Sequence, residues 1–177
     1  MIGKSVYFIA GIYGVGKTTL CNSLSAKLDC PSFSASDLIS GKVNEKYGAN
    51  KAVSNKEGNQ YVLIDAVNEI LINSAKIILV GHFCIFNKEN QVERLPVFVY
   101  RELHIEKIVL LEADINTICR RLSERDRKSY TFDSIRQLMY EENQMANTMA
   151  QQIGCPLLIH QMEFCDSDIE FIVNFLQ

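Results

Sequence analysis

The segment Gly11-Ile12-Tyr13-Gly14-Val15-Gly16-Lys17-Thr18-Thr19 most constrains how this chain of 177 residues can fold. It matches the pattern G-x-x-x-x-G-K-[ST], in which consecutive backbone N–H groups cradle phosphates. An apolar run from Val6 to Ala10 precedes it, and leucines at helical spacing follow it. A strand, a glycine loop and a helix in this order bring the loop N–H groups and the positive helix N-terminus to one anion. The chain is therefore expected to bind a nucleoside triphosphate.

Each position of this loop has an expected task. Lys17 is expected to reach the β- and γ-phosphates and to act in catalysis, and the Thr18 hydroxyl is expected to bind Mg²⁺. The expected cofactors are therefore ATP and Mg²⁺. The residues predicted to hold the nucleotide are Gly11, Gly14, Val15, Gly16, Lys17, Thr18 and Thr19.

Short apolar runs alternate with helical stripes along the whole chain, which predicts one α/β domain over residues 1–177. The expected architecture is a three-layer P-loop NTPase fold with a mostly parallel, five-stranded sheet, whose ligands lie at the carboxyl ends of the strands. The strands are expected at 5–10, 32–34, 77–80, 108–111 and 156–160, with a hairpin from 83–86 and 92–95. The helices are expected at 17–28, from 36, 59–73, 96–103, 114–124, 133–153, and after a cap at Asp166 or Ser167.

Composition excludes several classes of protein. A net charge of −3 and a pI of about 5.6 lack the basic balance of a nucleic-acid-binding surface. No apolar run has the length of a membrane span, and the first residues lead straight into a strand, so we expect no signal peptide and a cytoplasmic protein. The six cysteines form no C-x-x-C pair, which argues against a zinc site. The oligomeric state stays open, a homo-oligomer included.

A cluster of arginines predicts a short lid over residues 124–131. Phosphoryl transfer needs cations that meet the charge on the transferred group, and Arg121, Arg125 and Arg127 are assigned to that catalytic task. The alternative is a solvated helix end, at which the arginines pair with Glu124 and Asp126.

Two further residues are expected to contact the phosphate acceptor. Asp37 follows the second strand and opens the acceptor-side region, residues 35–58, and His82 follows the strand that ends at Val80. Both positions belong to the ligand edge of a parallel sheet. The alternatives are a helix cap by Ser34 or Ser36 beside Asp37, and a structural role for His82. Gly81 indicates a close approach of the backbone to another group.

The chain resembles the archaeal-type adenylate kinases and the short bacterial ATP-binding proteins similar to them. The resemblance covers nearly the whole chain and is carried by the glycine loop, Val80-Gly81-His82, Leu95-Pro96, Leu110 to Asp114, Arg120-Arg121-Leu122, Arg125-Asp126-Arg127 and the long helix that ends at Gly154. It implies ATP·Mg²⁺ as the donor and a nucleoside monophosphate as the acceptor.

Several positions depart from that family. The aspartate that ends the third strand and organises Mg²⁺ falls on Val80, and an arginine of the long helix falls on Asn143. Without the aspartate, the metal is left to Thr18, the phosphates, and Asp37 or Glu112. Residues 32–75 contain no arginine to clamp a monophosphate, and the substitutes there are Lys42, Lys46, Lys51 and Lys56. A lysine cannot reproduce the two-pronged contact that arginine makes with phosphate.

Three functional hypotheses follow. The first is a phosphotransferase of the nucleoside monophosphate kinase type, with AMP as the candidate acceptor. The second is a kinase for a non-nucleotide small molecule, and the third is a nucleotide-binding regulatory protein with weak ATPase activity, which Val80 motivates. A GTPase is disfavoured because the chain has no N-K-x-D motif.

Overall fold

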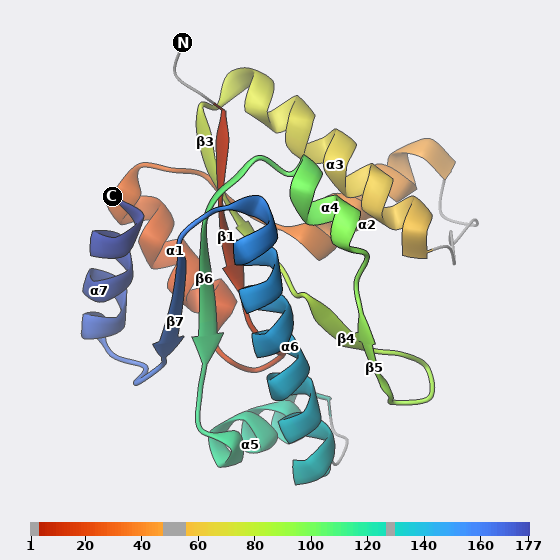
Figure 1. The fold of residues 1–177 in the computed structure, drawn as a ribbon, viewed down its shortest axis with the longest axis vertical. Helices are drawn as coiled ribbons and strands as arrows, with labels where there is room; N and C mark the ends of the chain where they lie inside the picture. The colour runs from red at the N-terminus through yellow and green to blue at the C-terminus, as the bar shows by residue number, and fades with distance from the viewer. Residues whose placement is uncertain (1–3, 48–55, 127–129) are drawn as a thin grey trace.

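The computed structural model describes residues 4–47, 56–126 and 130–177, without the side chains of residues 43–47, 56 and 57. Strands and helices are mixed along the whole chain (Figure 1). The strands are β1 (Ser5–Ala10), β2 (Ser32–Ser34), β3 (Lys76–Val80), β4 (Cys84–Phe86), β5 (Val92–Arg94), β6 (Ile105–Glu112) and β7 (Leu157–Gln161). The helices are α1 (Lys17–Leu28), α2 (Ala35–Tyr47), α3 (Lys56–Asn73), α4 (Val97–Glu102), α5 (Ile115–Asp126), α6 (Phe132–Ile153) and α7 (Asp166–Leu176).

Five of the strands form one parallel sheet in the order β2-β3-β1-β6-β7, as the sequence predicts. Successive connections run from β1 to one edge of the sheet and later to the other edge, so the order reverses beside β1. Open α/β sheets bind ligands at such a reversal, outside the carboxyl ends of the strands. The loop after β1 and the residues after β3 therefore meet at one point.

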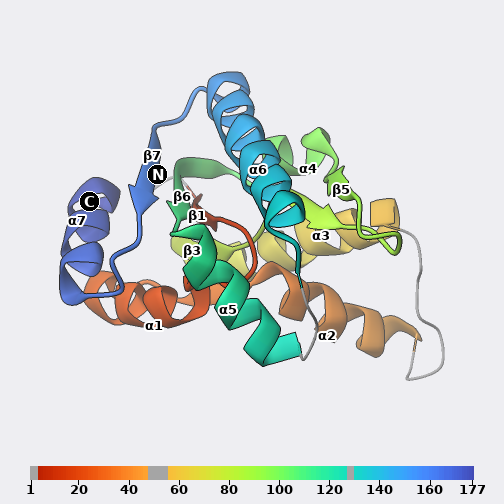
Figure 2. The same ribbon diagram turned by 90° about the horizontal axis from the view of Figure 1, so that it is seen from below.

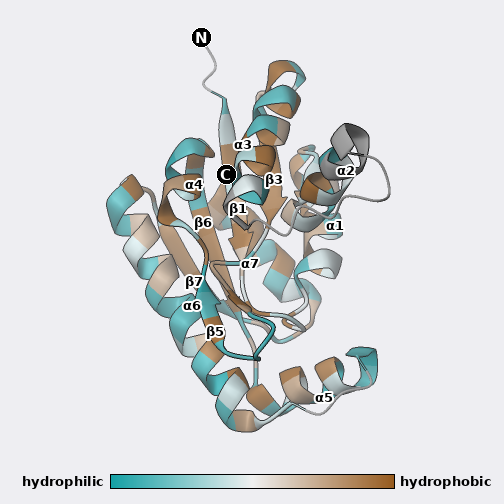
Figure 3. Ribbon diagram, turned by 90° about the vertical axis from the view of Figure 1, so that its right-hand side faces the viewer, coloured by the Kyte–Doolittle hydropathy of each residue, from teal (hydrophilic) through white to brown (hydrophobic). Residues whose placement is uncertain are grey.

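Helices cover both faces of the sheet. Helices α1 and α7 pack together on one face, while α4 and α6 cover the other (Figure 2). The strands β1, β3 and β6 are the most hydrophobic part of the ribbon (Figure 3). Every residue of β1 is buried, because this central strand has a neighbouring strand on each side and a helical layer on each face.

The antiparallel hairpin of β4 and β5 is the one feature outside this plan among the described residues. It was predicted from two short apolar runs around Asn87 to Asn90. Asn90 has a positive φ of 57° at the turn, and the Asn87 side chain accepts hydrogen bonds from the backbone of Glu89 and Gln91. Arg94 then ties the hairpin to α6 through Glu141, at 2.8 Å.

Several boundaries differ from the predictions, and both α3 and β6 begin three residues earlier than expected, at Lys56 and Ile105. Helix α2 runs to Tyr47 instead of ending after a short stretch, and α5 runs to Asp126, so part of the predicted lid is helix. The first residue outside α7 is Cys165, whereas Asp166 or Ser167 was expected. The Asp168 carboxylate folds back to accept from the Cys165 N–H at 3.1 Å, and this bond fixes the earlier start.

In the described part of the chain, no helix has both the length and the apolar character needed to cross a membrane.

Candidate active site

The glycine loop has the backbone geometry that a phosphate-binding loop needs. Gly11, Gly14 and Gly16 all have positive φ, at 146°, 79° and 99°. A Cβ on Gly11 would lie 2.7 Å from the Leu111 carbonyl oxygen, so the loop start has no room for a side chain. Gly16 is the residue before the first turn of α1, which directs the helix N-terminus into the loop. Val15 is fully buried and does not line the cavity described below.

Lys17 is held at the floor of this loop. Its Nζ donates hydrogen bonds to the carbonyl oxygens of Gly11 at 2.6 Å and Ile12 at 2.9 Å. Burial lowers the pKa of Lys17 to about 8, while the nearby Glu142 carboxylate opposes this shift. The ammonium group therefore stays charged at neutral pH and is anchored beside the loop N–H groups.

Glu142 on α6 joins the glycine loop to the hairpin, and the sequence analysis did not single it out. Its carboxylate is buried and accepts backbone N–H groups from Gly11 at 3.2 Å, Phe83 at 3.0 Å and Cys84 at 2.7 Å. Burial raises the pKa of Glu142 to about 7, against the lowering effect of these N–H groups and of Lys17. A signal was present in the sequence, because Glu142 continues the inward stripe of Ile135, Leu138, Met145 and Met149.

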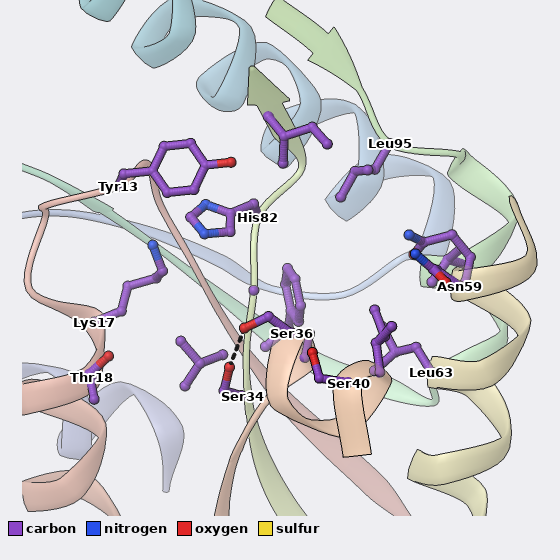
Figure 4. Close-up of a pocket in the computed structure, with 18 of the residues that line it drawn as sticks. Tyr13, Lys17, Thr18, Ser34, Ser36, Ser40, Asn59, Leu63, His82 and Leu95 are labelled. Carbon is purple, nitrogen blue, oxygen red and sulfur yellow. Dashed lines mark hydrogen bonds between the residues drawn. The ribbon is translucent and has the colours of Figure 1, made fainter. Parts of the chain in front are cut away.

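A cavity of about 790 Å³ opens from the loop toward α2, α3 and α4. Lys17 and Thr18 lie at its phosphate end (Figure 4). Arg125 also lines the cavity, and its guanidinium carbon is 6.0 Å from the centroid of the Tyr13 ring. The remainder, here called the acceptor end, combines uncharged polar side chains with apolar ones. The polar members are Ser34, Ser36, Ser40, Asn59 and Gln60, and the apolar members include Phe8, Ile39, Leu63, Leu95, Val99 and Tyr100.

His82 lies between these two ends. In Figure 4 its ring points into the cavity beside Tyr13, and the two ring centroids are 4.5 Å apart. Its backbone carbonyl accepts the Tyr100 hydroxyl at 2.6 Å, which fixes the residue at the end of β3. Gly81 allows this arrangement, since a Cβ there would lie 2.8 Å from the Phe8 ring. The close approach predicted at Gly81 is thus an approach to Phe8.

The environment of His82 predicts a pH-dependent stability. Burial first, and then the charges of Lys17 and Arg125, lower the pKa of His82 to about 3. Above pH 6.5 the ring is neutral in both the folded and the unfolded chain, whereas below it the unfolded chain binds the proton more readily. The free energy of unfolding should therefore fall as the pH drops from 6.5 toward 4, and this fall should be shallower in His82→Gln. Urea unfolding of both proteins at several pH values measures the difference, and parallel curves would contradict it.

The predicted arginines divide between two places. Arg121 stacks on the Phe164 ring, with its guanidinium carbon 3.7 Å from the ring centroid, and its Nη1 lies 3.4 Å from the Gly14 carbonyl oxygen. Arg125 reaches the cavity from the last turn of α5 and pairs with Asp126. This pairing is the one expected of a solvated helix end. Arg127 lies outside the described residues.

Asp37 does not line the cavity. It is exposed in the first turn of α2, and its backbone N–H lies 3.4 Å from the Ser34 hydroxyl. This is the helix cap that the sequence left as the alternative, with Ser34 as the capping residue. The cavity instead receives Ser34 and Ser36, whose hydroxyl oxygens are 2.9 Å apart.

The other proposed substitutes are also engaged elsewhere or not described. Lys42 pairs with Glu69 on α3. Asn143, which was named as a departure and not as a substitute, donates to Glu112 at 2.8 Å. The side chains of Lys46 and Lys56, and all of Lys51, lie outside the described residues. Among the described residues, the acceptor end therefore contains no side chain that could clamp a monophosphate.

The residues at the phosphate end fit a metal ion that enters with the nucleotide. Thr18 follows Lys17 at the cavity wall and presents a hydroxyl, a ligand type that Mg²⁺ accepts. No carboxylate belongs to the described lining residues, and the residue at the end of β3 is Val80. Mg²⁺ commonly keeps several waters and binds through phosphate oxygens, so one protein ligand is compatible with it.

Comparison with known proteins decides the family. A family model described as AAA domain (AAA_17) matches residues 10–139, from the last residue of β1 into α6. The chain belongs to this AAA domain family. The match contains the glycine loop, His82 and the arginine cluster of α5. Comparison with curated proteins finds no significant match.

Solved structures show that the AAA domain chain has the fold of the P-loop kinases. It aligns with shikimate kinase from Acinetobacter baumannii at a TM-score of 0.55 and 15% identity, over 98% of this chain and 92% of that one. Shikimate kinase from Bacteroides thetaiotaomicron aligns at 0.54 and 19%, over 98% and 96%. A sugar kinase from Janibacter sp. HTCC2649 aligns at 0.57 and 12%, over 98% and 94%. The predicted fold class is confirmed.

Proposed function

We propose that this AAA domain protein transfers the γ-phosphoryl group of ATP to a small acceptor. The observation that carries this proposal is one cavity that runs from the glycine loop, past His82, to a closed set of polar and apolar side chains. A phosphate loop beside a second, substrate-sized compartment allows the two reactants to meet with their reacting atoms in contact.

The chain's own residues supply positioning and charge. The loop N–H groups and the N-terminus of α1 bind the phosphates, and Lys17 places its ammonium group beside the transferred phosphoryl group. Arg125 adds a second cation from the last turn of α5. Mg²⁺, held by Thr18 and the phosphates, neutralises charge between the β- and γ-phosphates.

The nucleotide base has a candidate position outside the acceptor cavity. The Arg121 guanidinium and the Phe164 ring stack beside Gly14 and Gly16, and the exposed fraction of Phe164 is 40%. A flat cation–ring pair next to the phosphate loop offers a stacking surface to a purine. This arrangement leaves the acceptor end free for the second substrate.

The acceptor end favours a non-nucleotide acceptor over AMP. A monophosphate needs fixed cations, and the described residues place Lys17 and Arg125 at the phosphate end only. Two of the similar solved structures are named a shikimate kinase and a sugar kinase, and both names denote small-molecule acceptors. AMP remains the second candidate because the ordered motifs resemble adenylate kinases.

A coupled assay of ADP release tests this proposal. With ATP·Mg²⁺ present, nucleoside monophosphates, nucleosides, sugars and hydroxy acids are added one at a time. We expect at least one of them to raise turnover about tenfold or more over ATP alone. Turnover that ignores every acceptor, with ATP still bound, would instead support the regulatory protein with weak ATPase activity that Val80 motivates.

Arg125→Ala is expected to lower turnover far more than ATP affinity. Its charge meets the negative charge that develops on the bridging oxygen of ADP as the bond to the γ-phosphorus breaks, so the interaction is stronger in the transition state than in the ground state. A loss of about 10² in kcat with less than about threefold change in ATP Kd is expected. Arg120→Ala, an exposed arginine on the same helix, is the matched control. Equal losses in kcat and affinity would make Arg125 a ground-state binder.

A further inference from the structure

Resting on the proposed function, we propose that the acceptor is an uncharged compound with several hydroxyl groups, held between His82 and Asn59. The two side chains lie on different elements, at the end of β3 and near the start of α3 (Figure 4). Both line the same cavity. The proposal follows from their hydrogen bonding, from the remaining lining residues and from the charge inside the cavity.

The first argument is that both side chains hold a buried polar atom without a partner. His82 Nδ1 and Asn59 Oδ1 expose less than 1 Å² each and make no hydrogen bond within the described structure. A buried polar atom left without a partner costs about 1–3 kcal/mol, so such atoms are rare in folded proteins. Both side chains line one cavity, so a ligand there can become the missing partner once the imidazole and the amide rotate toward it.

The second argument is the chemistry that fits these two atoms. The low pKa of His82 keeps its ring neutral at pH 7, so one ring nitrogen donates and the other accepts. A hydroxyl group both donates and accepts, and it therefore pairs with either tautomer. Asn59 Oδ1 accepts only, and it requires a donor such as a second hydroxyl or an N–H group.

The third argument is the rest of the acceptor end. Ser34, Ser36 and Ser40 add three hydroxyl groups, and Gln60 adds an amide. Leu63, Leu95 and Val99 supply an apolar wall opposite them (Figure 4 labels the first two). A cavity wall that combines hydroxyl groups with apolar side chains suits a polyol, a sugar or a nucleoside, because these ligands carry both hydroxyl groups and C–H faces.

The fourth argument is electrostatic. ATP with one bound magnesium ion carries about two net negative charges, and Lys17 and Arg125 are the two cations among the described lining residues. Asp126 already pairs with Arg125, so the described lining residues offer no further positive charge to an anionic acceptor. An anionic acceptor would bring further negative charge into a buried space, whereas an uncharged one would not.

The transfer step needs no reactant other than ATP, the acceptor and water. The acceptor oxygen forms a bond to the γ-phosphorus, and the bond from that phosphorus to the bridging oxygen of ADP breaks. The hydroxyl proton passes to solvent water. Because the transition state for phosphoryl transfer is loose, the hydroxyl needs orientation more than a strong base. His82 provides this orientation through one hydrogen bond.

Matched pairs of compounds test the charge of the acceptor. Binding is measured by calorimetry to protein saturated with ADP·Mg²⁺, and turnover by ADP release. The pairs are adenosine with AMP, glucose with glucose 6-phosphate, and shikimate methyl ester with shikimate. We expect the uncharged member of at least one pair to bind at least about tenfold more tightly and to be the better acceptor. Tighter binding by anionic members, or no binding by any uncharged member, would overturn the inference.

Asn59→Leu tests the second contact with a side chain of nearly the same size. We expect the acceptor KM to rise at least about tenfold while the ATP KM stays within about twofold. Asn68→Leu, an exposed asparagine on the same helix, is the control and should change neither value. An unchanged acceptor KM in Asn59→Leu would remove Asn59 from the site.

These results separate the inference from the proposed function. Transfer to anionic acceptors alone would overturn the uncharged acceptor and leave the kinase assignment intact. ATP binding without transfer to any member of any pair would overturn both statements.

Discussion

Replacing Lys17 with alanine is expected to abolish both ATP binding and turnover at micromolar ATP. The change removes the cation that faces the β- and γ-phosphates, and the loop also loses the bonds from Nζ to the Gly11 and Ile12 carbonyls. Removing one such charge-stabilising group costs about 10²–10³ in kcat, and ATP affinity should fall by a similar factor because the same group binds the ground state. Calorimetry with ATP·Mg²⁺ and the ADP-release assay measure the two effects.

Lys27→Ala is the control for this variant. Lys27 lies on the same helix, is exposed and is far along α1 from the loop, so its loss should leave both measurements unchanged. ATP affinity that survives in Lys17→Ala would contradict the assignment of the glycine loop.

Glu142→Leu is expected to give the largest loss of stability. It leaves the N–H groups of Gly11, Phe83 and Cys84 without acceptors inside the core. Each buried N–H group without a partner costs about 1–3 kcal/mol, so the free energy of unfolding should fall by about 3 kcal/mol or more. Glu142→Gln keeps one acceptor oxygen and should lose less. Urea unfolding measures the change, and Glu170→Leu, an exposed glutamate on α7, is the control.

The same carboxylate should also influence the nucleotide. Glu142 positions the Gly11 backbone and therefore the start of the phosphate loop, so Glu142→Gln should weaken ATP binding even where the protein remains folded. Its pKa of about 7 lies above the ordinary value of 4.5. The folded chain thus holds this proton more readily than the unfolded chain, and Glu142 should lower the stability as the pH rises from 4.5 through 7. A Gln variant with unchanged ATP affinity and an unchanged pH profile would limit Glu142 to packing.

The fold was largely predictable because its signals are local. Continuous apolar runs such as Ile77 to Val80 indicate strands that are covered on both faces, and the glycine loop fixes the strand and helix around it. Helix α2 was underestimated because its polar sequence carries no strong stripe, and its contacts with α3 support it instead.

The cavity was less predictable because it is built from distant segments. Asp37 and Ser34 are three residues apart, and the sequence does not reveal that Ser34 both lines the cavity and caps α2 while Asp37 is exposed. Glu142 is 131 residues from Gly11, yet the two are joined by a hydrogen bond. In the sequence, the one sign of this contact is that Glu142 places a carboxylate on the apolar stripe of its helix. Asn59 carries no motif, and we propose it as a binding residue only because its amide oxygen is buried without a partner in the described structure.

The fate of the γ-phosphoryl group tests the central claim most directly. ATP labelled at the γ-phosphate is incubated with the protein, Mg²⁺ and the uncharged hydroxyl compounds, with Lys17→Ala as the blank. The label is then separated into inorganic phosphate and organic phosphate ester. We predict that most of the released label appears in the ester of one acceptor. Release of the label entirely as inorganic phosphate would contradict phosphoryl transfer and would make this chain an ATPase.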